Sequence, residues 1–264
     1  MIRNIITAAA LLAASAALAS AATVTTFTDL STTTTTDGVT CTVSGTTATI
    51  TATTSTDLFV SSNTGSTTSA SNYPYYSTTV TVVLDYSTVL SAATAITDSS
   101  DIVALVTIST GSSTATDIGI GLYNGSIVWT YGGVYYDSTN VFSLSDTTVT
   151  SAVDENGYLT VTVVANEYYT SSSHYSRMYL SDGTSYSSCY GLVSGSAVYT
   201  EIELNTEYVL GVTVTAGTDE TDIASTSTTL AAAVAAAAVP EPSTFGLLAG
   251  IGALALVAAR RRRR

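Results

Sequence analysis

Residues 117–130, with the sequence Asp-Ile-Gly-Ile-Gly-Leu-Tyr-Asn-Gly-Ser-Ile-Val-Trp-Thr, decide the fold class. Apolar side chains occupy every second position in 118–122, which is the pattern of a strand with one buried face. The pair Asn124-Gly125 separates this run from a second apolar run at 126–130. A type I′ turn requires a positive φ at both central residues, and Asn-Gly accommodates it at low cost. The stretch therefore predicts a β-hairpin.

The segments around the hairpin carry related patterns. Apolar residues alternate with others in 78–85, 158–165 and 210–215, and Thr, Val, Tyr and Ile suit a pleated, half-buried surface. The run 102–108 is almost unbroken, which is typical of a central strand covered on both sides. No long helix is expected in the body, although 88–96 suits a turn or two. Short strands between Gly, Ser, Asn and Asp clusters predict an all-β, two-sheet antiparallel sandwich.

The order of these features resembles a known fold family. The run 102–108, the Gly-rich hairpin and the later sequence Met178-Tyr179-Leu180-Ser181-Asp182-Gly183 follow one another as in the concanavalin A-like or laminin G-like jelly roll. The resemblance covers about residues 78–215. It implies a jelly-roll sandwich, a fold shared by lectins, adhesive modules and glycanases, and the fold alone does not choose among those functions.

Both ends of the chain indicate export. Residues 1–22 combine Arg3, an apolar stretch and small residues before a cleavage site, which is typical of a secretory signal peptide. Near the other end, sixteen uncharged residues, 244–259, would span about 24 Å as a helix, slightly less than a bilayer core. We expect a C-terminal transmembrane helix, oriented with its tail in the cytoplasm by Arg260, Arg261, Arg262, Arg263 and Arg264.

The same tail, introduced by Pro240, Glu241 and Pro242, closely resembles the PEP-CTERM sorting signal of Gram-negative bacteria. The resemblance implies processing by an exosortase after transient residence in the inner membrane. It also implies a final location at the cell surface or in the extracellular polysaccharide. An anchor that is never cut is the alternative. We therefore expect a signal peptide at 1–22, a sandwich domain at 23–229, an Ala-rich linker at 230–239 and the sorting signal at 240–264.

The charge of the body restricts its partners. The chain has 20 acidic residues, and all except Glu241 lie in the body, whose single basic residue is Arg177. Such a surface repels phosphate backbones, which excludes nucleic acid as a partner. It remains compatible with neutral glycans, cations or a basic protein, and acidity also serves solubility.

Tyrosines gather in clusters that suit recognition. They are Tyr73, Tyr75 and Tyr76; Tyr131, Tyr135 and Tyr136; and Tyr168, Tyr169 and Tyr175. An exposed tyrosine offers a flat apolar face and a hydroxyl, a combination that suits glycans. The alternative is ordinary packing between neighbouring strands. We take the first two clusters as candidate glycan-binding aromatics of a non-enzymatic, adhesive body that associates with exopolysaccharide; a ligand-free structural role remains open.

One acidic run suggests catalysis instead. On a strand, Glu201 and Glu203 would lie on one face about 7 Å apart, near the separation of a glycosidase carboxylate pair. The run loosely resembles the Glu-x-Asp-x-x-Glu signature of laminarinase-type glucanases. However, Glu203 replaces the Asp, and Glu207 lies one residue beyond the expected second glutamate. We expect no enzyme and keep a jelly-roll glycan hydrolase as the alternative.

Three further features need a structure. Cys41 and Cys189 enter an oxidising compartment, where a single disulfide is allowed, although the sequence does not show whether they meet. Laminin G-like modules often hold calcium, so Ca²⁺ is the one cofactor considered. Its candidate ligands are Asp98, Asp101, Asp137 and Asp146, but no loop pattern fixes them. The single histidine, His174, is expected in a loop.

Overall fold

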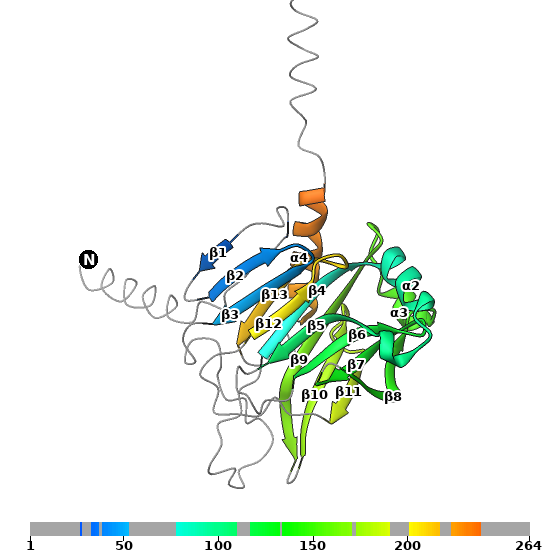
Figure 1. Cartoon of the computed structure of the whole chain (residues 1–264). Helices are drawn as coiled ribbons and strands as arrows, with labels where there is room; N and C mark the ends of the chain where they lie inside the picture. The colour runs from blue at the N-terminus through cyan, green and yellow to red at the C-terminus, as the bar shows by residue number, and fades with distance from the viewer. Residues whose placement is uncertain are drawn as a thin grey trace, which may run out of the picture.

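The computed structural model describes residues 27, 33–36, 39–52, 78–109, 117–132, 134–170, 173–190, 201–216 and 223–238. They form two antiparallel β-sheets packed face to face, with helices at one end and on the back (Figure 1). The predicted all-β, two-sheet antiparallel sandwich is confirmed. Within the described part of the chain, no helix is both long and apolar enough to cross a bilayer. The predicted span at 244–259 lies outside that part.

The larger sheet has eight strands in the order β1-β2-β3-β12-β5-β6-β7-β8. Their bounds are β1 Thr33–Thr36, β2 Val39–Ser44, β3 Thr47–Ala52, β12 Glu201–Asn205, β5 Val103–Ser109, β6 Ile118–Tyr123, β7 Ser126–Tyr131 and β8 Val134–Ser143. The four consecutive threonines 33–36 form β1, one of the two edge strands of this sheet.

The smaller sheet has five strands in the order β11-β10-β9-β4-β13. Their bounds are β4 Thr78–Asp85, β9 Tyr158–Thr170, β10 Ser173–Leu180, β11 Tyr186–Tyr190 and β13 Val209–Ala216. His174 lies in β10, opposite Tyr169 of β9, so its predicted loop position is wrong.

The predicted hairpin joins β6 to β7. Asn124 has a φ of 45° and Gly125 a φ of 71°, as a type I′ turn requires, and Tyr123 pairs with Ser126. The turn rests on α2, Tyr86–Ala95, because the Asn124 N–H donates to the Ile96 carbonyl and the Gly125 N–H to the Ala93 carbonyl. The Asp85 carboxylate caps the start of this helix by accepting from the Thr88 N–H. The helix is longer than the sequence suggested.

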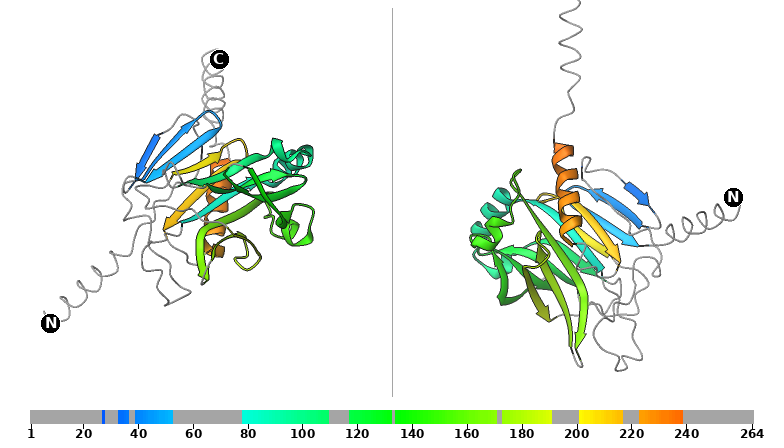
Figure 2. Two further views of the ribbon diagram at one scale, coloured as in Figure 1. Left: turned by 60° about the horizontal axis from the view of Figure 1, so that its bottom comes forward. Right: turned by 180° about the vertical axis from the view of Figure 1, so that it is seen from behind.

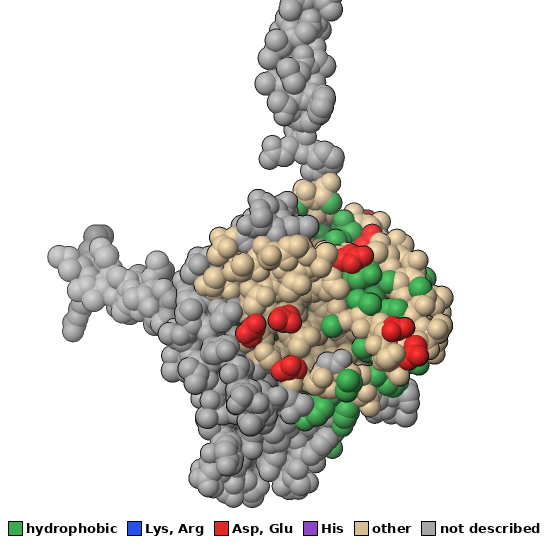
Figure 3. All heavy atoms as spheres, in the orientation of Figure 1, with side chains coloured by type: hydrophobic (Ala, Val, Ile, Leu, Met, Phe, Trp, Pro, Cys, Tyr) green, Lys and Arg blue, Asp and Glu red, His purple; other side chains and the backbone are tan. Residues whose placement is uncertain are grey.

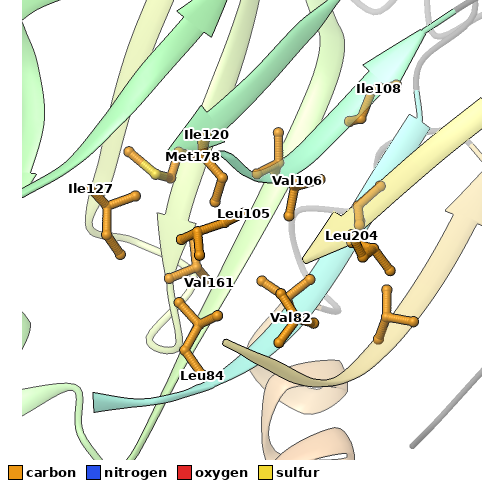
Figure 4. Close-up of a cluster of buried hydrophobic side chains, with 14 of the residues drawn as sticks. Val82, Leu84, Leu105, Val106, Ile108, Ile120, Ile127, Val161, Met178 and Leu204 are labelled. Atoms are coloured by element: carbon orange, nitrogen blue, oxygen red, sulfur yellow. The ribbon is translucent and has the colours of Figure 1, made fainter. Parts of the chain in front are cut away.

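The core lies between the two sheets. Val82, Leu84 and Val161 of the smaller sheet face Leu105 and other apolar side chains of the larger one (Figure 4). These are the residues that the period-two pattern placed on one face. Trp129 is fully buried among them and donates its indole N–H to Ser187 Oγ of β11 at 3.1 Å, which joins the two sheets through a polar contact.

The central strand β5 differs from the expectation in one respect. It lies in the middle of the larger sheet, as predicted, but Ala104 is exposed on its outer side. A register shift between Ala104 and Val106 marks a β-bulge, which places Leu105 and Val106 both in the core. The unbroken apolar run therefore reflects the bulge rather than cover on both faces.

The helix α4, Ile223–Ala238, covers the outer face of the smaller sheet. The rear view on the right of Figure 2 shows it lying over that sheet. The predicted domain boundary at 229/230 falls inside this helix, and 230–238 is not a free linker. The buried positions follow the helical spacing i, i+4, i+7, i+8, i+11, namely Ile223, Ser227, Leu230, Ala231 and Val234. The helix therefore belongs to the folded domain.

The possible disulfide between Cys41 and Cys189, which the sequence left open, is not formed in the structure, and both side chains are buried. Cys41 lies in β2, near one edge of the larger sheet, whereas Cys189 lies in β11, which contacts β8 at the opposite edge. A disulfide requires Cα atoms within about 7 Å of each other, and the width of the sandwich separates the two strands. Burial raises the pKa of the Cys41 thiol, which keeps it unreactive.

Candidate functional site

Four tyrosines from three neighbouring strands, β6, β7 and β8, form two aromatic pairs. Tyr123 and Tyr135 lie on the face of β7 that carries their partners Ser126 and Thr130, whereas Tyr131 lies on the opposite face. Tyr123 and Tyr135 lie with ring centroids 5.1 Å apart, and Tyr131 and Tyr136 lie 5.4 Å apart. Tyr136 is 39% exposed and the neighbouring Val134 is 63% exposed. We call Tyr123, Tyr131, Tyr135 and Tyr136 the tyrosine cluster.

The structure pairs the predicted Tyr131 with Tyr136, and it pairs the predicted Tyr135 with Tyr123. Reading the chain for local clusters missed Tyr123, because it stands alone in sequence. The hairpin could have indicated it, because Tyr123 directly precedes Asn124-Gly125 and the turn places the strand that contains it beside the strands that follow. The predicted Tyr73, Tyr75 and Tyr76 lie outside the described residues.

A second aromatic group lies on the smaller sheet and engages the basic residue of the body. The Arg177 guanidinium carbon is 4.4 Å from the Tyr186 ring centroid, and the Tyr179 and Tyr186 rings are 5.6 Å apart. Arg177 Nη1 also donates to the Tyr179 hydroxyl at 3.3 Å. Tyr186 is 52% exposed. Because Arg177 is held over a ring, it is poorly placed to pair with an acidic ligand.

Glu201 and Glu203 lie on the outer face of β12, while the alternate residues Ile202 and Leu204 point into the core. Their cross-strand neighbours are polar: Glu203 pairs with Thr49 on β3 and Thr107 on β5. Figure 3 shows the molecule from the side on which β12 lies in Figure 1; surface that is neither hydrophobic nor charged predominates around a few separate acidic patches. The pair therefore projects from an open polar sheet.

Of the candidate calcium ligands, Asp98 serves local structure. Asp98 accepts hydrogen bonds from the Ser100 N–H and Oγ, and these bonds lower the pKa of its carboxyl. Asp101 ends the short helix η2, Ser99–Asp101, and Asp146 precedes α3, Thr147–Ser151. Among the described residues, no group of three or more His, Cys, Asp or Glu side chains is arranged to hold a metal ion. Asp137 lies in β8.

A cleft of about 680 Å³ opens between α4, α3 and the ends of β9 and β10. Its lining is mixed: apolar surface is larger than polar surface, and hydroxyl groups come from Thr148, Ser151, Thr160, Ser181, Ser227 and Thr228. Asp154, Glu155 and Asp182 add carboxylates, and the lining residues among those described include no Lys, Arg or His. The sequence did not predict this cleft, because one wall is the helix that was read as a linker. We call it the α4 cleft.

Two turns fix the acidic wall of the α4 cleft. Asp154 Oδ1 accepts from the Asn156 and Tyr158 N–H groups, which holds the turn at Gly157 before β9. Asp182 Oδ1 accepts from the N–H groups of Thr184 and Ser185, and its Oδ2 from Ser185 Oγ. Partial burial favours a higher pKa for Asp182, but these hydrogen bonds outweigh it and lower the pKa.

The comparison with protein families identifies the C-terminal segment of the chain. An antiparallel β-sandwich carries a C-terminal segment, residues 238–264, that matches the PEP-CTERM protein-sorting motif. This motif is the exosortase substrate signal, and it marks an exported protein that passes through the membrane for sorting to the cell surface. The matched segment contains the predicted sorting residues Pro240, Glu241 and Pro242, which lie outside the described residues.

No curated protein matches the chain in sequence. Among solved structures, the receptor-binding domain of botulinum neurotoxin D is similar over 75% of this chain and 47% of that chain, with 10% identity and a TM-score of 0.37. This protein thus spans about half the length of that domain.

Two other solved structures are similar over 70% of this chain. One is an alginate lyase of polysaccharide lyase family 7, with 13% identity, 84% of its chain covered and a TM-score of 0.26. The other is the lectin UEA-II complexed with galactose, with 10% identity, 86% covered and a TM-score of 0.29. Because the TM-scores of all three structures are low, the assignment of this chain to the β-sandwich class rests on its own strand pairing.

Proposed function

We propose that the body is a non-enzymatic adhesive module that associates with extracellular polysaccharide once the sorting motif has delivered it. The tyrosine cluster is the observation that carries this proposal, because its two tilted ring pairs lie on three adjacent strands and one pair, Tyr131 with Tyr136, includes an exposed ring. Aromatic faces with a hydroxyl stack on sugar rings and hydrogen-bond at their rims. The acidic body, with its one arginine engaged by Tyr186, favours glycans without strong negative charge.

The test is co-sedimentation of the full-length protein with exopolysaccharide from the producing cells. Replacing Tyr131 and Tyr136 together by alanine is expected to weaken retention about tenfold or more, since stacked aromatic contacts carry much of such binding. Tyr186→Ala is the matched control, because Tyr186 is an exposed tyrosine outside the cluster. Equal retention of all three proteins would refute the tyrosine cluster as the binding surface.

We also propose that processing removes the arginine tail. Mass spectrometry of the C-terminal peptide from surface and culture fractions should find an end near Pro240 to Pro242. An intact Arg264 in the membrane fraction would instead establish a permanent anchor. The hydrolase alternative is tested separately: any glycan hydrolysis by the purified protein that Glu201→Gln and Glu203→Gln abolish would overturn the non-enzymatic proposal.

A further inference from the structure

The α4 cleft contains a buried hydroxyl that its own fold leaves unused. Ser227 is 1% exposed, and in the described structure its Oγ has no hydrogen-bond partner. An unpaired buried polar group is unfavourable, so such groups are uncommon unless something else satisfies them. Ser227 lines the cleft, which gives that missing partner a place to bind.

The neighbours of Ser227 on α4 show what an ordinary helical hydroxyl does. Thr228 Oγ1 donates to the Ala224 carbonyl and Thr229 Oγ1 to the Ser225 carbonyl, each at 2.9 Å. This bond to the carbonyl four residues earlier is the usual solution for Ser and Thr inside helices. Ser227 lacks it although it lies in the same helix and is more deeply buried.

The chemistry of the lining selects the ligand class. A volume of about 680 Å³ lies within the range of small-molecule sites, roughly 300–1,000 Å³. Three carboxylates and no basic side chain among the described lining residues oppose an anionic ligand. A bare metal ion is also poorly served, because both oxygens of Asp182 already accept hydrogen bonds. Hydroxyls beside Ala231 and the partly buried Tyr158 suit a neutral ring with many hydroxyl groups.

We infer that the α4 cleft binds a neutral sugar unit of a glycan chain, with Ser227 hydrogen-bonded to it. The inference deepens the proposed function and rests on it, since it names the class of glycan and a second contact point. It places this contact beneath a helix on the smaller sheet, on the opposite sheet from the tyrosine cluster.

The experiment measures binding of the full-length protein to cellotetraose, to a tetramer of N-acetylglucosamine and to tetramannuronate by calorimetry. At least one neutral probe should bind and the anionic probe should not. Ser227→Ala should weaken neutral binding about tenfold, the contribution of one hydrogen bond in a buried site. The same substitution should leave the melting temperature unchanged or higher, because it removes an unpaired group. A purely structural serine would show the reverse pattern.

A steric variant gives an independent test. Ala232 is exposed on the cleft wall, so Ala232→Trp should fill the cleft and abolish neutral binding. Ala236→Trp, also exposed but outside the lining, is the matched control and should bind normally. Neutral binding unchanged in both Ser227→Ala and Ala232→Trp would overturn the inference. If the Tyr131 and Tyr136 double variant alone lost polysaccharide retention, the proposed function would stand without this cleft.

Discussion

The outer faces of the two sheets are both rich in threonine, but they differ in how exposed those threonines are. The smaller sheet presents Thr79, Thr81, Thr160 and Thr162 outward, and all four are buried. The larger sheet presents threonines outward on β2 and β3, and these remain exposed or half-buried there. The difference is α4, which covers one face and leaves the other open (Figure 2). A threonine-rich outer face therefore does not reveal whether it meets solvent.

The covered face also uses its threonines differently. Thr81 Oγ1 and Thr162 Oγ1 share a hydrogen bond of 2.9 Å across β4 and β9 in a buried setting. On the open face, water can satisfy each hydroxyl, so such pairing is not required. On the covered face, threonine hydroxyls therefore need protein partners, whereas on the open face water can take that role.

The largest loss of stability is expected at Gly119 of β6, a position in the larger sheet where the neighbouring strand leaves no room for a side chain. A Cβ on Gly119 would lie 2.1 Å from the Val106 carbonyl oxygen, a contact that requires the backbone to move. Gly119→Val should therefore destabilise the protein by more than about 4 kcal/mol, among the largest single-residue effects. Chemical denaturation measures it. Ala104→Val, at an exposed site on the adjacent β5, should change stability by less than about 0.5 kcal/mol.

The next effect concerns the helix that covers the smaller sheet. Leu230 is 2% exposed and packs with Val83 and Val234. Leu230→Ala should cost about 2–3 kcal/mol through lost burial and a residual cavity. Thermal unfolding of the full-length protein measures it, with the exposed Ala237→Gly as a control for helix propensity alone, about 1 kcal/mol. Equal losses would mean that α4 does not pack as described.

A matched pair of threonines tests the contrast most directly. Thr81→Val leaves the Thr162 hydroxyl buried without its partner and should cost about 1–2 kcal/mol. Thr49→Val on the open face should change stability by less than about 0.5 kcal/mol. Similar values at the two positions would show that cover by α4 does not matter to these hydroxyls.

The smallest effect is the pH dependence at the edge of the α4 cleft. The hydrogen bonds that Asp182 accepts lower its pKa in the folded state, so its contribution is present above the ordinary aspartate value, near 4, and is lost as the pH falls through the lower folded value. Melting temperature should therefore decline below about pH 4, and less steeply in Asp182→Asn. Asp146→Asn, whose side chain makes no capping bond, is the control. An identical decline in Asp182→Asn would contradict the assignment.

Local sequence patterns predicted much of the fold and part of the site. Asn124-Gly125 specified its turn, because few residues accept positive φ at both positions. Val82, Leu84 and Val161 were placed in the core by alternation alone. Tyr131, Tyr135 and Tyr136 were found because they are neighbours in sequence, whereas Tyr123 and the α4 cleft were missed. The contact of Tyr123 with Tyr135 and the lining of the α4 cleft both join residues that are separated in the chain, and the periodicity of a short segment cannot predict such contacts.

Many of the strands, the hairpin turn and the C-terminal sorting motif could be predicted from the sequence, because each depends on backbone preference or on a contiguous run of residues. The tertiary structure decided which outer face is covered, that Cys41 and Cys189 stay apart, and where a cleft opens. Ile223–Ala238 shows the reason most clearly. Its buried stripe of Ile223, Leu230, Ala231 and Val234 is interrupted by Ser227, and most of the stability of such a helix comes from packing this face against the sheet.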